Sequence, residues 1–302
     1  ATHPFRSRPL RNTLHEARHT AHPVTLGKRS CSTTLTPMYY AINVPCFSPF
    51  DDLPRLAEHA RRAEENGWHG FFVWDHVQTP GHTPQTPEVF DPWIALALIA
   101  DQTTTVRLGP LVTPLPRRRP WIVARQAATI DHLSRGRLTL GMGLGHPAEE
   151  EFARFGEDPG LRQRAGKLDE GLAILRGLWS GEPFSFYGEH YRINKAHFLP
   201  RPFQAEIPIW IAGLWPNHGP MRRAARFQGA VPLDADARPL SPYALHEINA
   251  YLDEQRAAQA TSDAPFDLVV AGNTVGQDLA TAAATIAPYA AAGLDWWVET
   301  AF

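Results

Sequence analysis

Strand-like and helical segments alternate from Met38 to the end of this chain, and this alternation constrains its fold more than any other feature. Apolar runs typical of buried strands are separated by stretches with the spacing of amphipathic helices. We expect strands at residues 39–44, 70–74, 105–112, 137–142, 208–212, 229–233, 267–271 and 295–299. These repeated units predict an α/β protein, a (β/α)8 (TIM) barrel, with its active site on the loops that follow the strands.

Two irregularities are expected in this barrel. Residues 184–201 are too long for a simple connection, and 184–193 are typical of a small hairpin inserted after the fourth helix. The sequence ends at Phe302, directly after the last predicted strand, which leaves no residues for an eighth helix. Another segment is therefore expected to cover Trp296, Trp297 and Val298, and one hypothesis is that part of residues 1–37 does so.

Residues 1–37 differ in composition from the rest of the chain. They hold 6 of the 29 basic residues and only one of the 31 acidic residues, so 23 basic and 30 acidic side chains remain in residues 38–302. An upstream read-through, a targeting extension and a real arm all fit this composition. We therefore divide the chain into a basic N-terminal extension, residues 1–37, and a barrel domain, residues 38–302.

Composition also excludes several classes of function. The acidic barrel domain lacks the basic surface that nucleic-acid binding requires. No apolar run reaches the length of a membrane span, and the first thirty residues lack the apolar centre of a secretory signal. Cys31 and Cys46 are the only cysteines, too few for a disulfide scaffold. We expect a soluble, cytoplasmic protein.

The fourth predicted strand has one nearly bare face. Leu138, Leu140 and Met142 alternate with Thr139, Gly141 and Gly143, so that the second set shares a face with almost no side chains, and Gly145 follows. Glycine inside a strand indicates either close backbone packing or a ligand pressed against the main chain. Both interpretations, a barrel layer of small residues and a binding site for a flat ligand, fit this strand.

Several barrel chemistries lack the residues that they require. None of the three lysines, Lys28, Lys167 and Lys195, lies at a strand end, so Schiff-base chemistry has no nucleophile. The first strand ends without the paired histidines of metal-dependent hydrolases, so no metal site is expected. A glycosidase needs two neighbouring carboxyl groups. That option stays open because three acidic residues follow strands: Asp75, Asp234 and Glu299.

Asp75 and His76 follow the second strand, where barrel enzymes carry catalytic groups. His76 is our candidate for proton transfer. The alternative is a loop histidine bonded to a backbone carbonyl. Asp75 either orients the His76 ring or caps the next turn.

Two further strand ends offer groups that could bind a ligand. Thr113 is a candidate donor after the third strand, unless this proline-rich segment is only a rigid loop. After the fifth strand, the sequence runs Ala212, Gly213, Leu214, and the N–H groups of the last two residues suit a phosphate beside a helix N-terminus. Arg222, Arg223 and Arg226 follow on that helix, where they either assist or form its solvated face.

Together these segments resemble the luciferase-like flavin-dependent oxidoreductases, a family that includes bacterial luciferase, FMN monooxygenases and enzymes using the deazaflavin F420. The resemblance extends from Tyr39 to Glu299. It rests on residues 73–76 (Val-Trp-Asp-His), 133–137 (Leu-Ser-Arg-Gly-Arg), 141–145 (Gly-Met-Gly-Leu-Gly), 168–171 (Leu-Asp-Glu-Gly), 207–213 (Ile-Pro-Ile-Trp-Ile-Ala-Gly) and 296–299 (Trp-Trp-Val-Glu).

The resemblance implies a flavin or deazaflavin in the barrel mouth, with its ring near strands 2 to 4, including Thr113 and the glycines at 141, 143 and 145. Its phosphate would lie near residues 212–214, which are Ala212, Gly213 and Leu214. In the F420-dependent branch, the histidine of the Asp-His pair is catalytic and a glutamate follows the strand 4 glycines. Here His76 matches, but His146 occupies the place of the acid.

We interpret the chain as an FMN-dependent monooxygenase of a small organic substrate, with His76 as proton donor or acceptor. F420-dependent hydride transfer is the alternative within the enzyme class, and a non-catalytic flavin-binding barrel is the alternative outside it. A separate flavin reductase is an optional partner, and a homo-oligomer, most simply a dimer, is expected.

Overall fold

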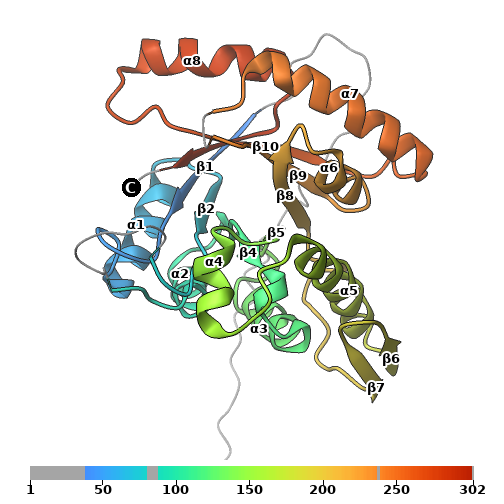
Figure 1. The fold of residues 1–302 in the computed structure, drawn as a ribbon. Helices are drawn as coiled ribbons and strands as arrows, with labels where there is room; N and C mark the ends of the chain where they lie inside the picture. Colours follow the sequence, from blue (N-terminus) through green and yellow to red (C-terminus); the bar gives the residue numbers. More distant parts are fainter. Residues whose placement is uncertain (1–37, 80–87, 237–238, 301–302) are drawn as a thin grey trace, which may run out of the picture.

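The computed structural model describes residues 38–79, 88–236 and 239–300, and within them it shows the predicted barrel (Figure 1). Parallel strands follow one another around a ring in the order β3-β2-β1-β11-β10-β9-β8-β5-β4. A bridge between Leu108 and Leu138 joins the β3 side to the segment that enters β5. The strands of this ring are β1 (Tyr39–Val44), β2 (Gly70–Val73), β3 (Arg107–Pro110), β4 (Thr113–Pro114), β5 (Leu140–Gly143), β8 (Ile209–Trp215), β9 (Gly229–Asp234), β10 (Asp267–Gly272) and β11 (Trp296–Thr300).

Each predicted strand is present, with one difference in the third. Residues 105–112 do not form one strand, because β3 ends at Pro110 and the short β4 begins at Thr113 and pairs with β5 instead. Proline has no N–H to give to a sheet, which explains an interruption at this point. The chain therefore turns at the mouth of the barrel, beside Gly141 and Gly143.

Helices surround the ring, and capping residues fix where several of them begin. Asp52, Asp91 and Ser241 accept hydrogen bonds from the first turns of α1, α2 and α7, each of which also has a proline there. The barrel helices are α1 (Leu53–Glu65), α2 (Pro92–Gln102), α3 (Pro120–Leu133), α5 (Leu161–Trp179), α6 (His218–Ala224), α7 (Pro242–Ala258) and α8 (Leu279–Ala291). A one-turn helix, α4 (Ala148–Glu151), follows β5.

The inserted hairpin is confirmed. Antiparallel strands β6 (Phe184–Tyr187) and β7 (Arg192–Ala196) lie beyond α5, at the edge of the molecule (Figure 1). Glu170 of α5 accepts hydrogen bonds from the backbone N–H groups of Glu189, His190 and Tyr191, so the hairpin turn is fixed to the helix. Asp169, the preceding residue, accepts a hydrogen bond from Arg223 of α6, so both acids of this pair stabilise the scaffold.

The aromatic residues of β11 are buried by their neighbours on both faces of the sheet. Trp296 points into the barrel, where its ring stacks on Tyr39 at 4.8 Å and lies 5.4 Å from the Trp210 ring. Trp297 points outward, and Tyr289 of α8 packs edge-on against it at 5.1 Å. The hypothesis that residues 1–37 cover this strand concerns residues outside the described part of the chain.

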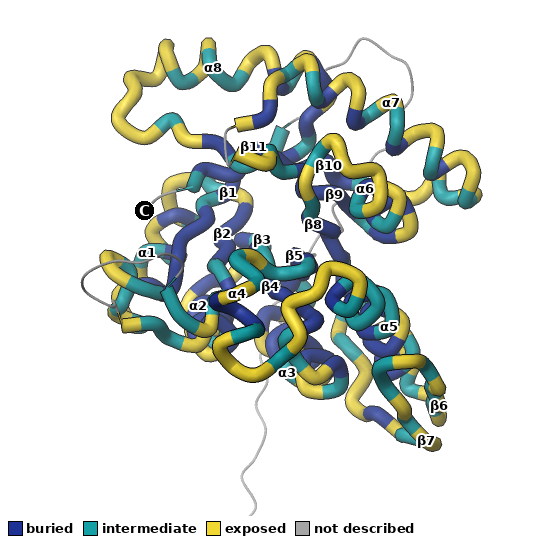
Figure 2. The backbone as a smooth tube through the Cα atoms, in the orientation of Figure 1, coloured by how far each residue is buried: buried dark blue, intermediate teal, exposed yellow. Residues whose placement is uncertain are grey.

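Burial follows the layers of the fold, since the ring strands are buried while the helices expose their outer faces (Figure 2). Trp210 and Trp296 fill the barrel interior, and small residues such as Ala41 and Ala212 share this interior cluster. None of the helices in the described residues combines the length and apolar content needed to cross a bilayer.

Barrel enzymes carry their active sites at the carboxyl ends of the strands, so we expect the active-site region at the carboxyl ends of β1 to β5.

Candidate active site

Asp75 is a buried anchor at the end of β2. Its side chain accepts hydrogen bonds from Trp93 Nε1 (3.1 Å), Thr113 Oγ1 (2.8 Å) and Arg118 Nε (2.8 Å), and it also pairs with Arg117. Burial alone would raise the pKa of Asp75, but Arg118 and Arg117 hold it below its usual value. Asp75 therefore remains ionised and ties together β2, β4 and α2. It does not orient the His76 ring, and the Thr113 hydroxyl is committed to Asp75 rather than free for a ligand.

His76 meets a carboxylate that is distant in sequence. Its Nδ1 lies 2.8 Å from Glu151 Oε1, and one fifth of the His76 side chain is exposed while Glu151 is buried. Burial and the nearby Arg117 lower the pKa of His76 to about 4, against the opposing effect of Asp75 and Glu150. The imidazole is therefore neutral at pH 7. A loop histidine bonded only to a backbone carbonyl is not what the structure shows.

Sequence reasoning missed Glu151. The resemblance placed an acid directly after Gly145, where His146 stands, and His146 is exposed in the loop. The signal was the acidic run of Glu149, Glu150 and Glu151 in α4. A one-turn helix has no periodicity that would reveal which of the three side chains turns toward β2.

Two of the three glycines near β5 are explained by packing within the protein. A Cβ at Gly141 would lie 2.7 Å from the Pro110 carbonyl oxygen, and one at Gly145 would lie 2.8 Å from the Phe152 ring. Gly145 also has a φ of +86°, which favours glycine. Gly143 is different, because its closest neighbours are the side chains of Val112 (3.1 Å) and Ala212 (3.7 Å). Cofactor contact at these three glycines stays a prediction. Gly143 and the neighbouring Ala212 are the best candidates for residues that contact a cofactor ring.

The end of β8 is also shaped by packing. A Cβ at Gly213 would lie 2.1 Å from Pro220 Cβ, so glycine allows α6 to turn closely against the strand. Leu214 is 41% exposed. Phosphate binding at Gly213 and Leu214 stays a prediction.

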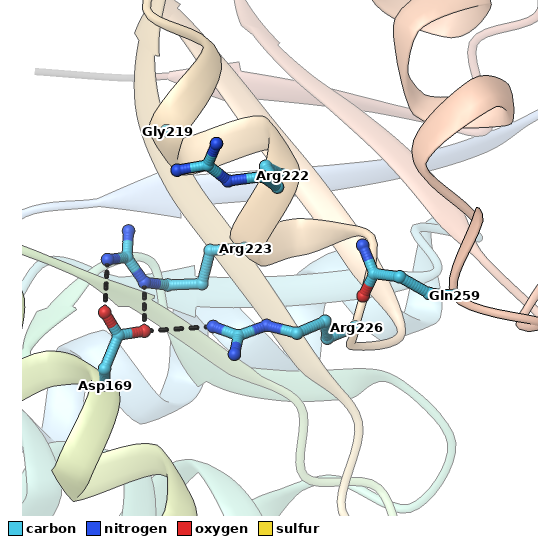
Figure 3. A pocket seen from close by; sticks show the side chains of 6 residues that line it. All are labelled: Asp169, Gly219, Arg222, Arg223, Arg226 and Gln259. Atoms are coloured by element: carbon cyan, nitrogen blue, oxygen red, sulfur yellow. Dashed lines mark hydrogen bonds and ion pairs between the residues drawn. The ribbon is translucent and has the colours of Figure 1, made fainter.

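Arg223 of α6 and Arg226, which follows this helix, form ion pairs with another helix. Arg223 donates twice to Asp169 of α5, at 2.7 and 2.8 Å, and Arg226 donates once at 3.0 Å (Figure 3). Together with Gly219, Arg222 and Gln259, these residues line a pocket of about 370 Å³. Although burial opposes it, Arg223 and Arg226 lower the pKa of Asp169, so the ion pairs persist at neutral pH. This geometry matches helix-to-helix pairing on a solvated face.

The glycosidase option fails on the placement of its carboxyl groups. Glu299 accepts hydrogen bonds from Trp297 Nε1 and Thr274 Oγ1, both at 2.9 Å, on the outward side of β11. Asp75 is enclosed by its own partners, and Asp234 accepts a bond from the Asp236 N–H. No pair of these acids faces a common substrate position. Within the described residues, no group of three or more His, Cys, Asp or Glu side chains is arranged to hold a metal ion.

Two buried polar atoms lie without partners at the mouth of the barrel. Asn43 of β1 and Thr300 of β11 are opposite each other in register, and both share the interior face with Ala41 and Val298. Asn43 Nδ2 donates to the Leu111 carbonyl at 3.3 Å, but Asn43 Oδ1 and Thr300 Oγ1 have no hydrogen-bond partner among the described residues. Buried polar atoms are usually satisfied, so these two atoms are candidates for hydrogen bonds to water or to a polar group of a ligand.

Comparison with known proteins identifies the family of this chain. The family model of luciferase-like monooxygenases matches residues 25–299. The chain belongs to this family. It is 34% identical over 166 residues to an F420-dependent hydroxymycolic acid dehydrogenase of Mycobacterium tuberculosis, a match that covers 54% of this chain and 44% of that protein. It is 36% identical over 168 residues to an F420-dependent glucose-6-phosphate dehydrogenase of Kineococcus radiotolerans, covering 54% and 48%.

These matches span about half the length of the relatives. A solved structure, an F420-dependent secondary alcohol dehydrogenase in complex with an F420-acetone adduct, superposes with a TM-score of 0.73 at 19% identity. That superposition covers 88% of this chain and 94% of the other. At this identity the likeness concerns the fold alone.

Proposed function

We propose that this chain is an F420-dependent oxidoreductase that interconverts an alcohol and a carbonyl compound by hydride transfer. The neutral His76, held at the mouth of the barrel by a buried carboxylate, carries this proposal. The relatives named above, both of them F420-dependent dehydrogenases, support F420 over FMN. FMN-dependent monooxygenation, the first interpretation of the sequence, is therefore the weaker alternative.

The residues at the mouth fit a flat polar cofactor. Gly143 and Ala212 leave one side of β5 and β8 with little side-chain bulk. Asn43 Oδ1 and Thr300 Oγ1 offer unsatisfied polar atoms on the interior faces of β1 and β11. When bound, F420 supplies a two-electron carrier that accepts or gives hydride.

His76 is the residue that we expect to accept the hydroxyl proton of the substrate and to return it. Oxidation of an alcohol releases the hydroxyl proton, and the neutral imidazole of His76 has a nitrogen lone pair that can accept it. In the reverse direction the imidazolium returns the proton to the carbonyl oxygen. Asp75, locked between Arg117 and Arg118, keeps the end of β2 in place and does not exchange protons itself.

Cofactor binding tests the proposal. The purified chain is titrated with F420 and with FMN by fluorescence, and turnover is then measured with a panel of secondary alcohols and sugar phosphates. We expect tighter binding of F420 and its reduction by at least one alcohol. Preference for FMN with oxygen consumption would favour the monooxygenase, for which a separate flavin reductase is an optional partner. Binding without turnover of any substrate would favour the non-catalytic barrel.

A further inference from the structure

We propose that Glu151 is a positioning residue that holds His76 in the tautomer protonated at Nδ1, so that Nε2 is the atom that exchanges a proton with the substrate. This inference rests on the proposed function for its catalytic meaning. The tautomer itself is a property of the free protein, and it can be measured without any cofactor.

The contact between the two side chains decides which nitrogen carries the proton. Glu151 Oε1 lies 2.8 Å from His76 Nδ1, within hydrogen-bond distance. An ionised carboxylate only accepts hydrogen bonds, so Nδ1 must be the donor. A neutral imidazole with a proton on Nδ1 has its lone pair on Nε2.

Arg117 fixes Glu151 in place, and a guanidinium beside a carboxyl group favours the ionised form of that group. Its guanidinium pairs with Asp75 on one side and with Glu151 on the other, and all three side chains are largely buried. Asp75 is in turn held by Trp93, Thr113 and Arg118, so the position of Glu151 is tied to β2. The positive charge of Arg117 also opposes a second proton on His76.

Hydrogen bonds from Gln78 and Arg164 hold the segment from Gly145 to Glu151, which includes α4, in place. Gln78, two residues after His76, donates from Nε2 to the Glu150 carbonyl at 2.9 Å. Arg164 of α5 donates to the Gly145 carbonyl at 2.7 Å, and its guanidinium lies 5.3 Å from the Phe152 ring. A buried, anchored acid of this kind can orient an imidazole because it has little freedom to move away.

Nitrogen-15 spectroscopy of histidine-labelled protein tests the tautomer directly. The chain has 14 histidines, so the His76 signals are assigned by their loss in His76→Asn. Near pH 7 we expect a protonated Nδ1 and an unprotonated Nε2. A protonated Nε2 with a bare Nδ1, or an imidazolium, would overturn the proposal.

The variant Glu151→Gln tests the cause. Glutamine keeps the shape but can donate as well as accept, so we expect His76 to show a mixture of both tautomers. Glu149→Gln, an exposed acid in the same helical turn, is the matched control and should leave the His76 signals unchanged. An unchanged single tautomer in a folded Glu151→Gln protein would show that Glu151 does not set it.

Kinetics then connect the tautomer to turnover. If the proposed function holds, Glu151→Gln should lower kcat by about 10²-fold or more with little change in KM, since loss of the correct histidine tautomer is costly in other enzymes. Unchanged kcat alongside an altered tautomer would remove the catalytic part of the inference. Should Glu151→Gln fail to fold, the spectrum of the unmodified protein still decides the tautomer. Absence of F420 activity would count against the proposed function and leave the tautomer result intact.

Discussion

Asp75 and His76 are adjacent in sequence, yet they face different partners. Asp75 is surrounded by Trp93, Thr113 and two arginines, whereas His76 meets Glu151. The first residue stabilises the end of β2, and the second keeps one fifth of its side chain exposed. The two neighbouring side chains therefore differ: Asp75 is enclosed by its partners, whereas His76 remains accessible and is our candidate for proton transfer.

Replacing His76 should affect turnover and not the fold. We expect His76→Asn to lower kcat by about 10²- to 10⁴-fold, the usual contribution of general acid–base catalysis, while its melting temperature and F420 affinity stay near those of the unmodified protein. Steady-state kinetics and thermal unfolding measure both. His246→Asn, an exposed residue of α7, is the control. A fully active His76→Asn protein would contradict the assigned role.

Replacing Asn43 should weaken ligand binding without lowering the stability of the free protein. Because its Oδ1 is buried without a partner, we expect Asn43→Leu to leave the free protein as stable or about 1 kcal/mol more stable. The same change should weaken F420 binding or raise the substrate KM about tenfold. Urea unfolding, fluorescence titration and kinetics measure these effects.

Asn249→Leu is the matched control for Asn43. Asn249 Nδ2 already donates to the Ala292 carbonyl at 2.8 Å, so this variant should lose stability and keep its ligand affinity. Normal F420 affinity together with a normal KM in Asn43→Leu would show that no ligand uses Asn43.

At the scale of elements, the barrel strands are held together by tryptophans and a few buried polar groups. Trp210 of β8 donates from Nε1 to Asp267 at the start of β10, at 3.0 Å. Arg107 of β3 is also close enough to influence Asp267. These contacts cross the interior and link strands that are not neighbours in the sheet.

Asp267 should make stability depend on pH. Burial raises the pKa of Asp267 from 3.8 to about 6, against the opposing effect of Arg107, so the folded state retains a proton that the unfolded chain has already lost. The stabilisation is complete below pH 3.8 and is lost as the pH rises through about 6. As the pH rises from 3.8 to about 6, the unfolding free energy of Asp267→Asn should therefore increase relative to that of the unmodified protein, and the difference should reach about 2 to 3 kcal/mol above this range.

Urea unfolding at several pH values from 4 to 8 measures this difference. Asp253→Asn, on the exposed side of α7, should run parallel to the unmodified protein over the same range. A constant difference between Asp267→Asn and the unmodified protein would mean that Asp267 does not titrate in this window.

At the scale of the whole molecule, apolar side chains remain on one side of the helical layer. Ile94 and Leu98 of α2 are 57% and 38% exposed, and Ile122 of the neighbouring α3 is 51% exposed. A helix that is apolar on both sides is usually buried. We therefore expect these exposed side chains of α2 and α3 to form the interface of a homodimer.

Light scattering after size exclusion measures the molar mass of this assembly. We expect a dimer for the unmodified chain and a monomer for Ile94→Glu combined with Leu98→Glu. Tyr243→Glu, an exposed aromatic change on α7, should remain dimeric. A monomeric unmodified chain at tens of micromolar would refute the dimer, and a dimeric double variant would exclude this surface.

The barrel, the inserted hairpin and all the strands except the interrupted third one could be predicted from the amino-acid pattern. This was possible because the spacing of apolar residues and the capping residues act within one element, as at Asp52 and Pro54. The same pattern also located His76 at a strand end, since the order of strands and loops fixes which residues lie at the mouth. Family membership followed from the same local motifs.

The partner of each site residue depends on how distant segments pack together, which no local pattern predicts. Ring closure brings α4 against the end of β2, so Glu151 rather than Asp75 contacts His76. The same closure presses Pro110 onto Gly141 and directs Thr113 to Asp75. These contacts join residues that are between 31 and 75 positions apart in the sequence. They depend on how all the strands assemble into one ring, so no local pattern along the chain predicts them.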